Sequence, residues 1–153
     1  MPDVRIVELE PTRVVAALGF GQVPEEQAWE LINGYLAEQG IEPSGSHRFF
    51  GFNNPDPTPG SPNYGYEQWV TVADDAMASP PLETKQFAGG QYAALHFRGL
   101  EKIGEAWNQL VAWVEEEGYN IATGEHNCLE ELKTPLETPQ DEWEFTLYLG
   151  VSR

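Results

Sequence analysis

The chain has 153 residues, with 25 Asp and Glu against 8 Lys and Arg, so its formal net charge is −17. This length fits one domain or two small halves sharing a core, and an apolar content of 41% is too high for a disordered chain. The charge argues against binding to nucleic acids or anionic membranes, since both require clustered Lys and Arg. A negative field attracts cationic ligands, although the acids can also serve solubility alone.

The first half of the chain predicts two strands, a helix and two further strands. Pro11-Thr12 is typical of a turn between the first two strands. The helix is predicted from Pro24 to Gly40, because Pro favours the first turn and Gly the C-terminal end. Its apolar stripe comprises Ala28, Leu31, Ile32, Tyr35 and Leu36. The expected strands span residues 5–10, 13–20, 48–53 and 67–72.

The second half predicts the same kinds of element. A strand-like segment at residues 85–97 is broken by Gly89-Gly90, which is a strong turn signal. A helix follows and stops at Gly118. Its apolar residues, at helical spacing, are Ile103, Ala106, Trp107, Leu110, Val111 and Val114. The closing strands are expected at residues 128–133 and 143–151.

Several short motifs occur twice, in the same order, at an offset of 77 to 80 residues. We interpret them as a tandem duplication, with repeat one at about residues 1–78 and repeat two at about 79–153. Each β-α-β-β half is too small to supply a sufficient core alone, so we expect one pseudo-symmetric α+β domain with an antiparallel sheet, two helices and a ligand groove between the halves. The matching pairs include Ala28-Trp29 with Ala106-Trp107, Gly40 with Gly118, and Pro55-x-x-Thr58-Pro59 with Pro135-x-x-Thr138-Pro139.

Cellular location is read from what the sequence lacks. Cys128 is the only cysteine, so an internal disulfide is excluded and nothing indicates an oxidising compartment. The start of the chain shows no leader peptide, and no apolar run approaches 18 residues. We expect a cytoplasmic protein, either a monomer or a weak homodimer.

Common catalytic and cofactor motifs are missing from the sequence. It contains no phosphate-binding loop, no G-x-S-x-G, no C-x-x-C and no H-E-x-x-H. His126, Cys128 and Glu130 alternate along a predicted strand and are residue types that bind zinc, but no further His/Cys cluster offers a fourth ligand. A polar strand start is the preferred interpretation, and we expect neither a metal nor a cofactor.

Aromatic residues and glutamates alternate on the predicted strands. A carboxylate framed by aromatic rings is suited to a cation, because each desolvated cation–π contact contributes roughly 0.5–2 kcal/mol. The opposing interpretation is that the rings are cross-strand core pairs and the glutamates face solvent. Alternation leaves open which of Glu130, Glu131 and Glu144 faces inward. The aromatic residues are Phe49, Phe50, Phe52, Tyr64, Tyr66, Trp69, Tyr92, Phe97, Trp143, Phe145 and Tyr148.

Four stretches resemble the GyrI-like small-molecule-binding domains, which are also the effector-binding parts of MerR- and AraC-type multidrug regulators. The resemblance covers essentially the whole chain, and it depends on the order of the stretches and the duplication more than on any single motif. The stretches are Arg48-Phe49-Phe50-Gly51-Phe52-Asn53-Asn54-Pro55, Tyr64-Gly65-Tyr66-Glu67-x-Trp69, Gly89-Gly90-x-Tyr92-Ala93, and Leu129-Glu130-Glu131 followed by Trp143-Glu144-x-x-Leu147-Tyr148-Leu149.

The resemblance implies a pocket between the halves that takes bulky hydrophobic or cationic aromatic molecules. It implies that Glu130 lies in that pocket as the counter-charge, with Glu144 as the second acidic candidate. The regulators of this family also carry a helix-turn-helix domain, which this sequence lacks, so we expect a stand-alone domain that does not bind DNA. The candidate walls are Phe52, Tyr66, Trp69, Tyr92, Trp107 and Tyr148.

Three functions are compatible with these features. The preferred one is a binding module for a hydrophobic or cationic small molecule. The second is a hydrolase, because some stand-alone relatives resemble enzymes that open cyclopropane rings in alkylating compounds. There Glu130 would act as general base on water, and Tyr66 or Tyr92 would polarise the developing oxyanion. The third is an acidic inhibitor of a basic protein.

Overall fold

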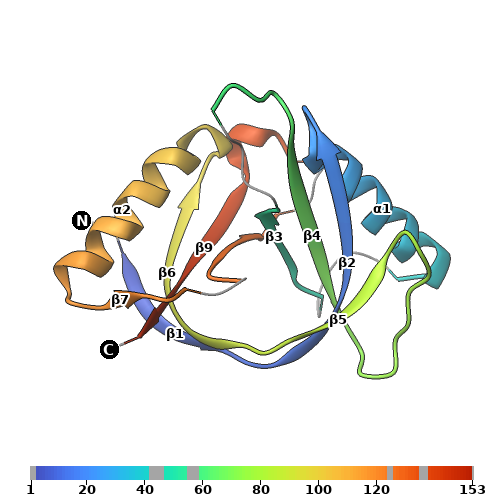
Figure 1. Ribbon diagram of the computed structural model, residues 1–153, viewed down its shortest axis with the longest axis horizontal. Coiled ribbons are helices and arrows are strands. Elements are labelled where there is room, and N and C mark those ends of the chain that lie inside the picture. The colour runs from blue at the N-terminus through green and yellow to red at the C-terminus, as the bar shows by residue number, and fades with distance from the viewer. Residues whose placement is uncertain (1–2, 42–46, 55–58, 124–125, 135–137, 153) are drawn as a thin grey trace. The chain divides into compact units, whose positions relative to one another are not determined.

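The described part of the chain forms two units, each with one helix and an antiparallel sheet. The structure is a computed structural model that describes residues 3–41, 47–54, 59–123, 126–134 and 138–152 (Figure 1). The middle unit is Thr12–Phe87, and the terminal unit combines Met1–Pro11 with Ala88–Arg153. The predicted α+β class, with two helices and antiparallel strands, is confirmed.

The middle unit has the strand order β5-β2-β4-β3, and every neighbouring pair is antiparallel. Its elements are β2 (Thr12–Gly21), α1 (Pro24–Gln39), β3 (Phe49–Asn53), β4 (Tyr64–Val72) and β5 (Glu83–Phe87). Helix α1 covers one face of this sheet (Figure 1). Val15 and Ala17 of β2 and Val70 of β4 meet Ala28 and Ile32 of the helix there, so α1 fixes which strand positions face the opposite side.

The terminal unit has the equivalent order, β1-β6-β9-β8, again antiparallel throughout. Its main elements are β1 (Val4–Leu9), β6 (Gly90–Arg98), α2 (Ile103–Glu116), β8 (Cys128–Leu132) and β9 (Glu144–Ser152). Helix α2 buries Ala106, Leu110 and Val114 against Leu147 and Leu149 of β9. Smaller elements, absent from the sequence prediction, are two 3-10 turns (Leu100–Lys102 and Gln140–Glu142) and β7 (Asn120–Ile121), which pairs with the end of β9.

The helix ends follow the glycine signals. Gly40 has φ 67° and Gly118 has φ 79°, the left-handed conformation that glycine adopts without strain. The amide of Ile41 reaches back to Leu36 O at 2.8 Å, and that of Tyr119 reaches Val114 O at 3.1 Å. Both helix ends are therefore closed by backbone hydrogen bonds, as their sequences predict.

The compact units do not follow the expected repeat limits at residue 78. Strand β1 precedes the middle unit in sequence but pairs with β6, and β5 lies in the expected second repeat but pairs with β2. The predicted breaks at Pro11-Thr12 and Gly89-Gly90 lie at these transitions. Gly89 has φ 74°, and a side chain there would overlap the carbonyl of Leu9. The repeat assignment concerns sequence ancestry and stays a prediction, and its Pro55, Thr58 and Pro135 lie outside the described residues.

Within the described residues, neither helix is long and apolar enough to cross a membrane.

Candidate functional site

The face of the middle sheet that points away from α1 is lined with aromatic rings. Phe52 meets Trp69 edge to face at 5.1 Å between ring centroids, and Trp69 lies 5.4 Å from Phe87. Phe50 lies 6.5 Å from Phe87. These four side chains are buried, and Trp69 has no exposed surface. The register explains the grouping, because Phe50 pairs with Trp69 across β3 and β4 and cross-strand partners share a face.

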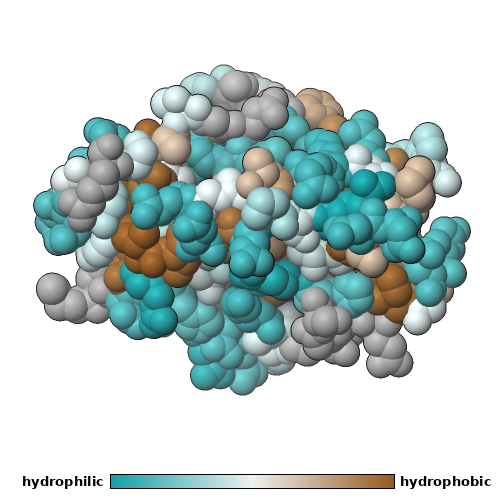
Figure 2. Space-filling model, turned by 90° about the horizontal axis from the view of Figure 1, so that it is seen from below, coloured by the Kyte–Doolittle hydropathy of each residue, from teal (hydrophilic) through white to brown (hydrophobic). Residues whose placement is uncertain are grey.

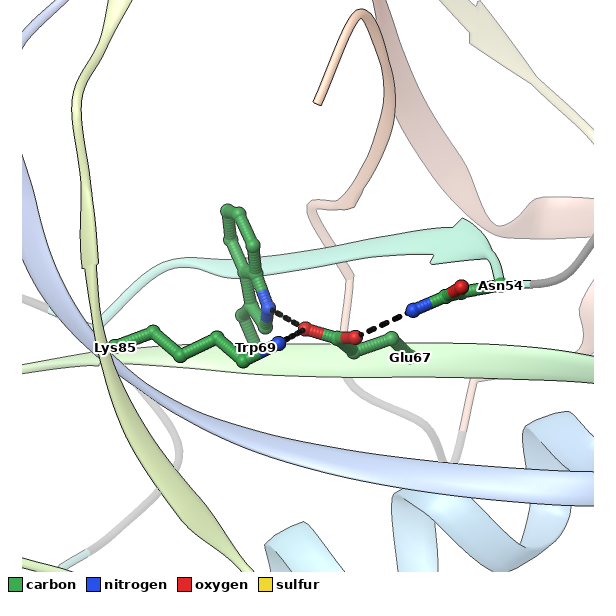
Figure 3. A network of polar contacts seen from close by, with 4 residues as sticks. All are labelled: Asn54, Glu67, Trp69 and Lys85. Carbon is green, nitrogen blue, oxygen red and sulfur yellow. Dashed lines mark hydrogen bonds and ion pairs between the residues drawn. The ribbon is translucent and has the colours of Figure 1, made fainter. Parts of the chain in front are cut away.

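A buried carboxylate lies on this aromatic face. Glu67 is 3% exposed and lies two residues before Trp69 on β4, so both side chains leave the strand on the same side. Trp69 Nε1 donates to Glu67 Oε2 at 2.7 Å, and Asn54 Nδ2 donates to Oε1 at 3.0 Å. Lys85 Nζ forms an ion pair with Oε2 at 2.8 Å. Figure 3 shows the three donors converging on the carboxylate from different strands and a loop.

These donors determine the protonation state of Glu67. Burial raises the pKa of the carboxyl group. The hydrogen bonds from Lys85, Trp69 and Asn54, together with the positive charge of Lys85, lower the pKa by more than burial raises it, so the pKa lies below its usual value. Glu67 is therefore ionised at neutral pH. A buried carboxylate of this kind requires a positive partner, and here Lys85 is that partner.

Exposed apolar side chains adjoin the carboxylate on the same face. Leu18 pairs with Glu67 across β2 and β4, and Phe20 pairs with Gly65, so both point away from α1. Leu18 is 54% exposed and Phe20 is 58% exposed. On the face drawn in Figure 2, hydrophilic residues cover most of the surface and hydrophobic ones form separate patches. Leu18 and Phe20 thus form a small exposed apolar surface next to the buried acid, which a bound ligand could cover.

The terminal unit has a comparable group on the face of its sheet opposite α2. Glu131 of β8 is 2% exposed, and the hydroxyl of Tyr148 donates to its Oε1 at 2.6 Å. Lys133 Nζ lies 3.2 Å from the same oxygen. Tyr92 meets Tyr148 edge to face at 6.2 Å. Each unit therefore places a buried glutamate against an aromatic hydrogen-bond donor and a lysine.

Tyr92 has a second notable contact, since its hydroxyl donates to His126 O at 2.7 Å. Burial raises the pKa of this hydroxyl, and the nearby Cys128 raises it further. Tyr92 is therefore a neutral hydrogen-bond donor throughout the physiological pH range.

Glu130 and Glu144, the other two glutamates whose orientation alternation left open, are less buried than Glu131. Glu130 is half-buried on the opposite face of β8 from Glu131, and Trp107 of α2 donates its Nε1–H to Glu130 Oε2 at 3.2 Å. Glu144 is 46% exposed and accepts from His96 Nε2 at 2.9 Å. Of the three, only Glu131 is buried, and Glu130 is the one that contacts an indole.

The remaining predicted site residues are split between two faces of the middle sheet. Phe52 and Trp69 lie together beside Glu67. Tyr66 is buried with α1 on the other face, where its ring covers Gly51 of β3. Alternation along β4 therefore separates the Tyr66 side chain from the Glu67 carboxylate.

Sequence reasoning missed Glu67 and Lys85 as site residues. Glu67 lies inside one of the quoted stretches, and the spacing Glu67-x-Trp69 on a strand was the signal that the two side chains share a face. Lys85 had no comparable signal, because its contact with Glu67 depends on β5 pairing with β2 and not with the strand that follows it.

The zinc interpretation gains no support from the geometry. Among the described residues, no three His, Cys, Asp or Glu side chains gather closely enough to hold a metal ion. Cys128 is exposed at the start of β8.

The chain belongs to the family described as GyrI-like small molecule binding domain, which it matches over residues 2–152. It is therefore a small-molecule-binding domain. No curated protein matches the sequence.

Solved structures with the same fold include EcmrR, both as its C-terminal domain and in a complex with DNA, and a protein described as a hydrolase. The EcmrR C-terminal domain has a TM-score of 0.73 at 13% identity, with 100% of this chain and 99% of that domain covered. EcmrR in its complex with DNA has a TM-score of 0.79 at 13% identity. The match covers 99% of this chain but only 57% of the EcmrR chain. A hydrolase from Listeria innocua has a TM-score of 0.68 at 11% identity, with 97% of this chain and 91% of that protein covered.

A further structure with this fold contains a bound cation. SAV2435 bound to tetraphenylphosphonium has a TM-score of 0.57 at 10% identity, with 98% of this chain and 94% of that protein covered. At these identities the likeness shows the fold alone.

Proposed function

We propose that this domain binds bulky hydrophobic or cationic aromatic molecules, with a glutamate among aromatic rings as the counter-charge. The observation that carries the proposal is the ammonium group already seated on Glu67, 2.8 Å from its carboxylate. A buried acid that holds a primary ammonium beside Trp69 and Phe52 has the charge and the ring surfaces that a cation requires.

The exposed side chains of Leu18 and Phe20 extend this binding surface. An aromatic body resting on them would cover apolar area while its positive centre lies near Glu67. Binding of tetraphenylphosphonium by SAV2435, a protein with the same fold, supports a lipophilic aromatic cation as the ligand class. The net charge of −17 adds long-range attraction for such a cation.

Glu130 remains the second candidate for the counter-charge, on the basis of the family resemblance. Its carboxylate is half-buried and accepts a hydrogen bond from Trp107, so it also combines an acid with an indole. Glu67 and Glu130 lie in different units, and separate substitutions distinguish their contributions.

Titration with tetraphenylphosphonium tests the proposal, using calorimetry or the quenching of tryptophan fluorescence. We expect Glu67→Gln to weaken binding by about 10- to 100-fold, the equivalent of one charge-assisted contact of about 1.5–3 kcal/mol. Glu130→Gln is the parallel test of the second candidate. Glu83→Gln, at an exposed position of β5, is the matched control for loss of one negative charge.

The anion tetraphenylborate, which has the same shape, separates charge selection from simple hydrophobic binding. The wild-type protein should prefer the cation strongly. Equal binding of the two ions, or full affinity in both Glu→Gln variants, would rule out a glutamate counter-charge.

The alternative function is hydrolysis of cyclopropane-containing alkylating compounds. The observation that favours it is the 2.6 Å hydrogen bond between the Tyr148 hydroxyl and the buried Glu131 carboxylate, which unites a potential oxyanion donor with a potential base. The sequence predicted Glu130 as the base with Tyr66 or Tyr92 as the oxyanion donor, and of these two tyrosines only Tyr92 lies in the same unit as Glu130. Mass spectrometry of a cyclopropane substrate incubated with wild type and Glu131→Gln tests this function. A substrate that is bound but recovered unchanged would contradict it.

Other parts of the proposal concern the protein as a whole. We propose that it acts in the cytoplasm as a monomer or weak homodimer, without nucleic acid or membrane. The shared strand order of the two units supports the tandem duplication. Light scattering across a concentration series, and a gel-shift assay at low salt, test the oligomeric state and the absence of nucleic-acid binding.

A further inference from the structure

The ion pair between Lys85 and Glu67 joins two groups with unequal access to solvent. The side chain of Glu67 is 4% exposed, whereas that of Lys85 is 34% exposed. Lys85 lies on β5, which stands at the end of the strand order of the middle unit and pairs with β2 among the described residues. Its ammonium can therefore leave the carboxylate and become hydrated by rotation about its side-chain bonds, while Glu67 stays in place.

The other donors to Glu67 are neutral, and Trp69 among them is fixed by burial. Trp69 is fully buried and packed between Phe52 and Phe87, and Asn54 holds the other carboxylate oxygen. If Lys85 moved away, these two hydrogen bonds would keep the carboxylate oriented but would leave its charge uncompensated. The vacated position next to Oε2 would then favour another cation over a neutral group.

We propose that Lys85 is an exchangeable internal counter-ion, which occupies Glu67 in the ligand-free protein and is displaced when a cationic ligand binds. This inference rests on the proposed function and adds a determinant of its affinity and selectivity. A ligand cation must compete with the tethered ammonium. The measured affinity therefore equals the intrinsic affinity multiplied by the fraction of molecules in which Lys85 has left the site. A neutral ligand cannot replace the charge and leaves the ion pair closed.

The first test is the affinity of Lys85→Met for tetraphenylphosphonium. Methionine keeps much of the apolar stem and removes the competing charge. We expect binding at least about fivefold tighter than in wild type, and no gain for tetraphenylborate. Lys102→Met, on a surface turn of the terminal unit, is the matched control for loss of a positive charge. Circular dichroism at each step verifies that the variants are folded.

The second test uses the wild-type protein, so it does not depend on the folding of a variant. Amine-reactive labelling with mass spectrometry measures the modification rate at Lys85, with Lys102 as the internal reference. Saturating tetraphenylphosphonium should increase the rate at Lys85 several-fold, because its amine is released into water. A lysine that keeps its structural ion pair would react at an unchanged or lower rate.

The outcomes separate this inference from the proposed function. Binding to wild type that Lys85→Met does not tighten, together with unchanged labelling, would overturn the inference and leave the proposed function standing. Failure of wild type and Lys85→Met alike to bind tetraphenylphosphonium would reject both. Binding by Lys85→Met alone would support both, with Lys85 blocking the site in wild type.

Discussion

Replacing Glu67 by Gln should destabilise the folded protein by an amount that depends on pH. The substitution keeps the shape of the side chain but removes the charge that meets Lys85, Trp69 and Asn54. Breaking a buried ion pair costs about 3–5 kcal/mol, and about 2–4 kcal/mol is expected here because the freed Lys85 can reach solvent. In a domain of this size, a loss of about 3 kcal/mol corresponds to a decrease of about 6–12 °C in Tm.

The sign of the pH dependence follows from the lowered pKa of Glu67. A carboxyl group whose pKa is lower in the folded than in the unfolded state stabilises the fold above its unfolded pKa, about 4.3. This contribution is lost as the pH falls through the folded pKa. The difference in unfolding free energy between wild type and Glu67→Gln should therefore be largest near pH 7 and decrease below pH 4.

Urea denaturation of wild type, Glu67→Gln and Glu83→Gln between pH 7 and pH 3 measures this difference. Comparing variants at each pH removes the general effect of protonating the other acidic residues. Glu83 is exposed, so its variant should follow wild type at every pH. If the difference between wild type and Glu67→Gln stayed constant over this range, the ionised Glu67 would not be the stabilising species.

Three further predictions concern single side chains. Gly51→Ala should lower the unfolding free energy by about 1–3 kcal/mol in urea denaturation, because the new methyl group would overlap the buried Tyr66 hydroxyl. Leu110→Ala should cost about 2–5 kcal/mol in the same assay, since Leu110 has no exposed surface beneath α2. Because the pKa of Tyr92 is raised in the folded state, its neutral hydroxyl contributes stability below about pH 10, and this contribution is lost as the pH rises through the folded pKa. Tyr92→Phe should therefore show a smaller decrease in Tm at alkaline pH than wild type.

The sequence predicted the elements well where local signals and periodicity agree. The stripe of α1 was predicted from spacing, and four of its five residues are buried, with Leu31 packed at the margin. The strands at residues 13–20 and 143–151 differ from β2 and β9 by one residue at each end. For β2 the preceding Pro11 and the terminal Gly21 mark these limits, and for β9 the β-favouring composition does, without reference to tertiary contacts.

Strand pairing was beyond local reasoning. Pro11-Thr12 and Gly89-Gly90 were correctly identified as breaks, but a break does not specify whether the next strand turns back onto the previous one or joins another sheet. Here the chain passes between units at both points, so β1 joins β6 and β5 joins β2. The contact of Lys85 with Glu67 depends on that pairing, which is why the ion pair was not predicted.

The register also explains why comparing the two halves of the sequence did not reveal their similar acidic groups. Phe52 pairs with Glu67 in one unit, and Glu131 pairs with Thr146 in the other, each residue of the second pair lying 79 positions after its counterpart. The buried glutamate thus occupies the same paired position in both sheets but comes from opposite strands of the pair. Aligning the two halves by position matches each acid with a non-acidic residue. The strand pairing instead shows that each acid holds the equivalent paired position in the sheet of its own unit. Because a carboxylate from either strand reaches the same face, sequences can exchange the strand that carries the acid and keep the chemistry of that face.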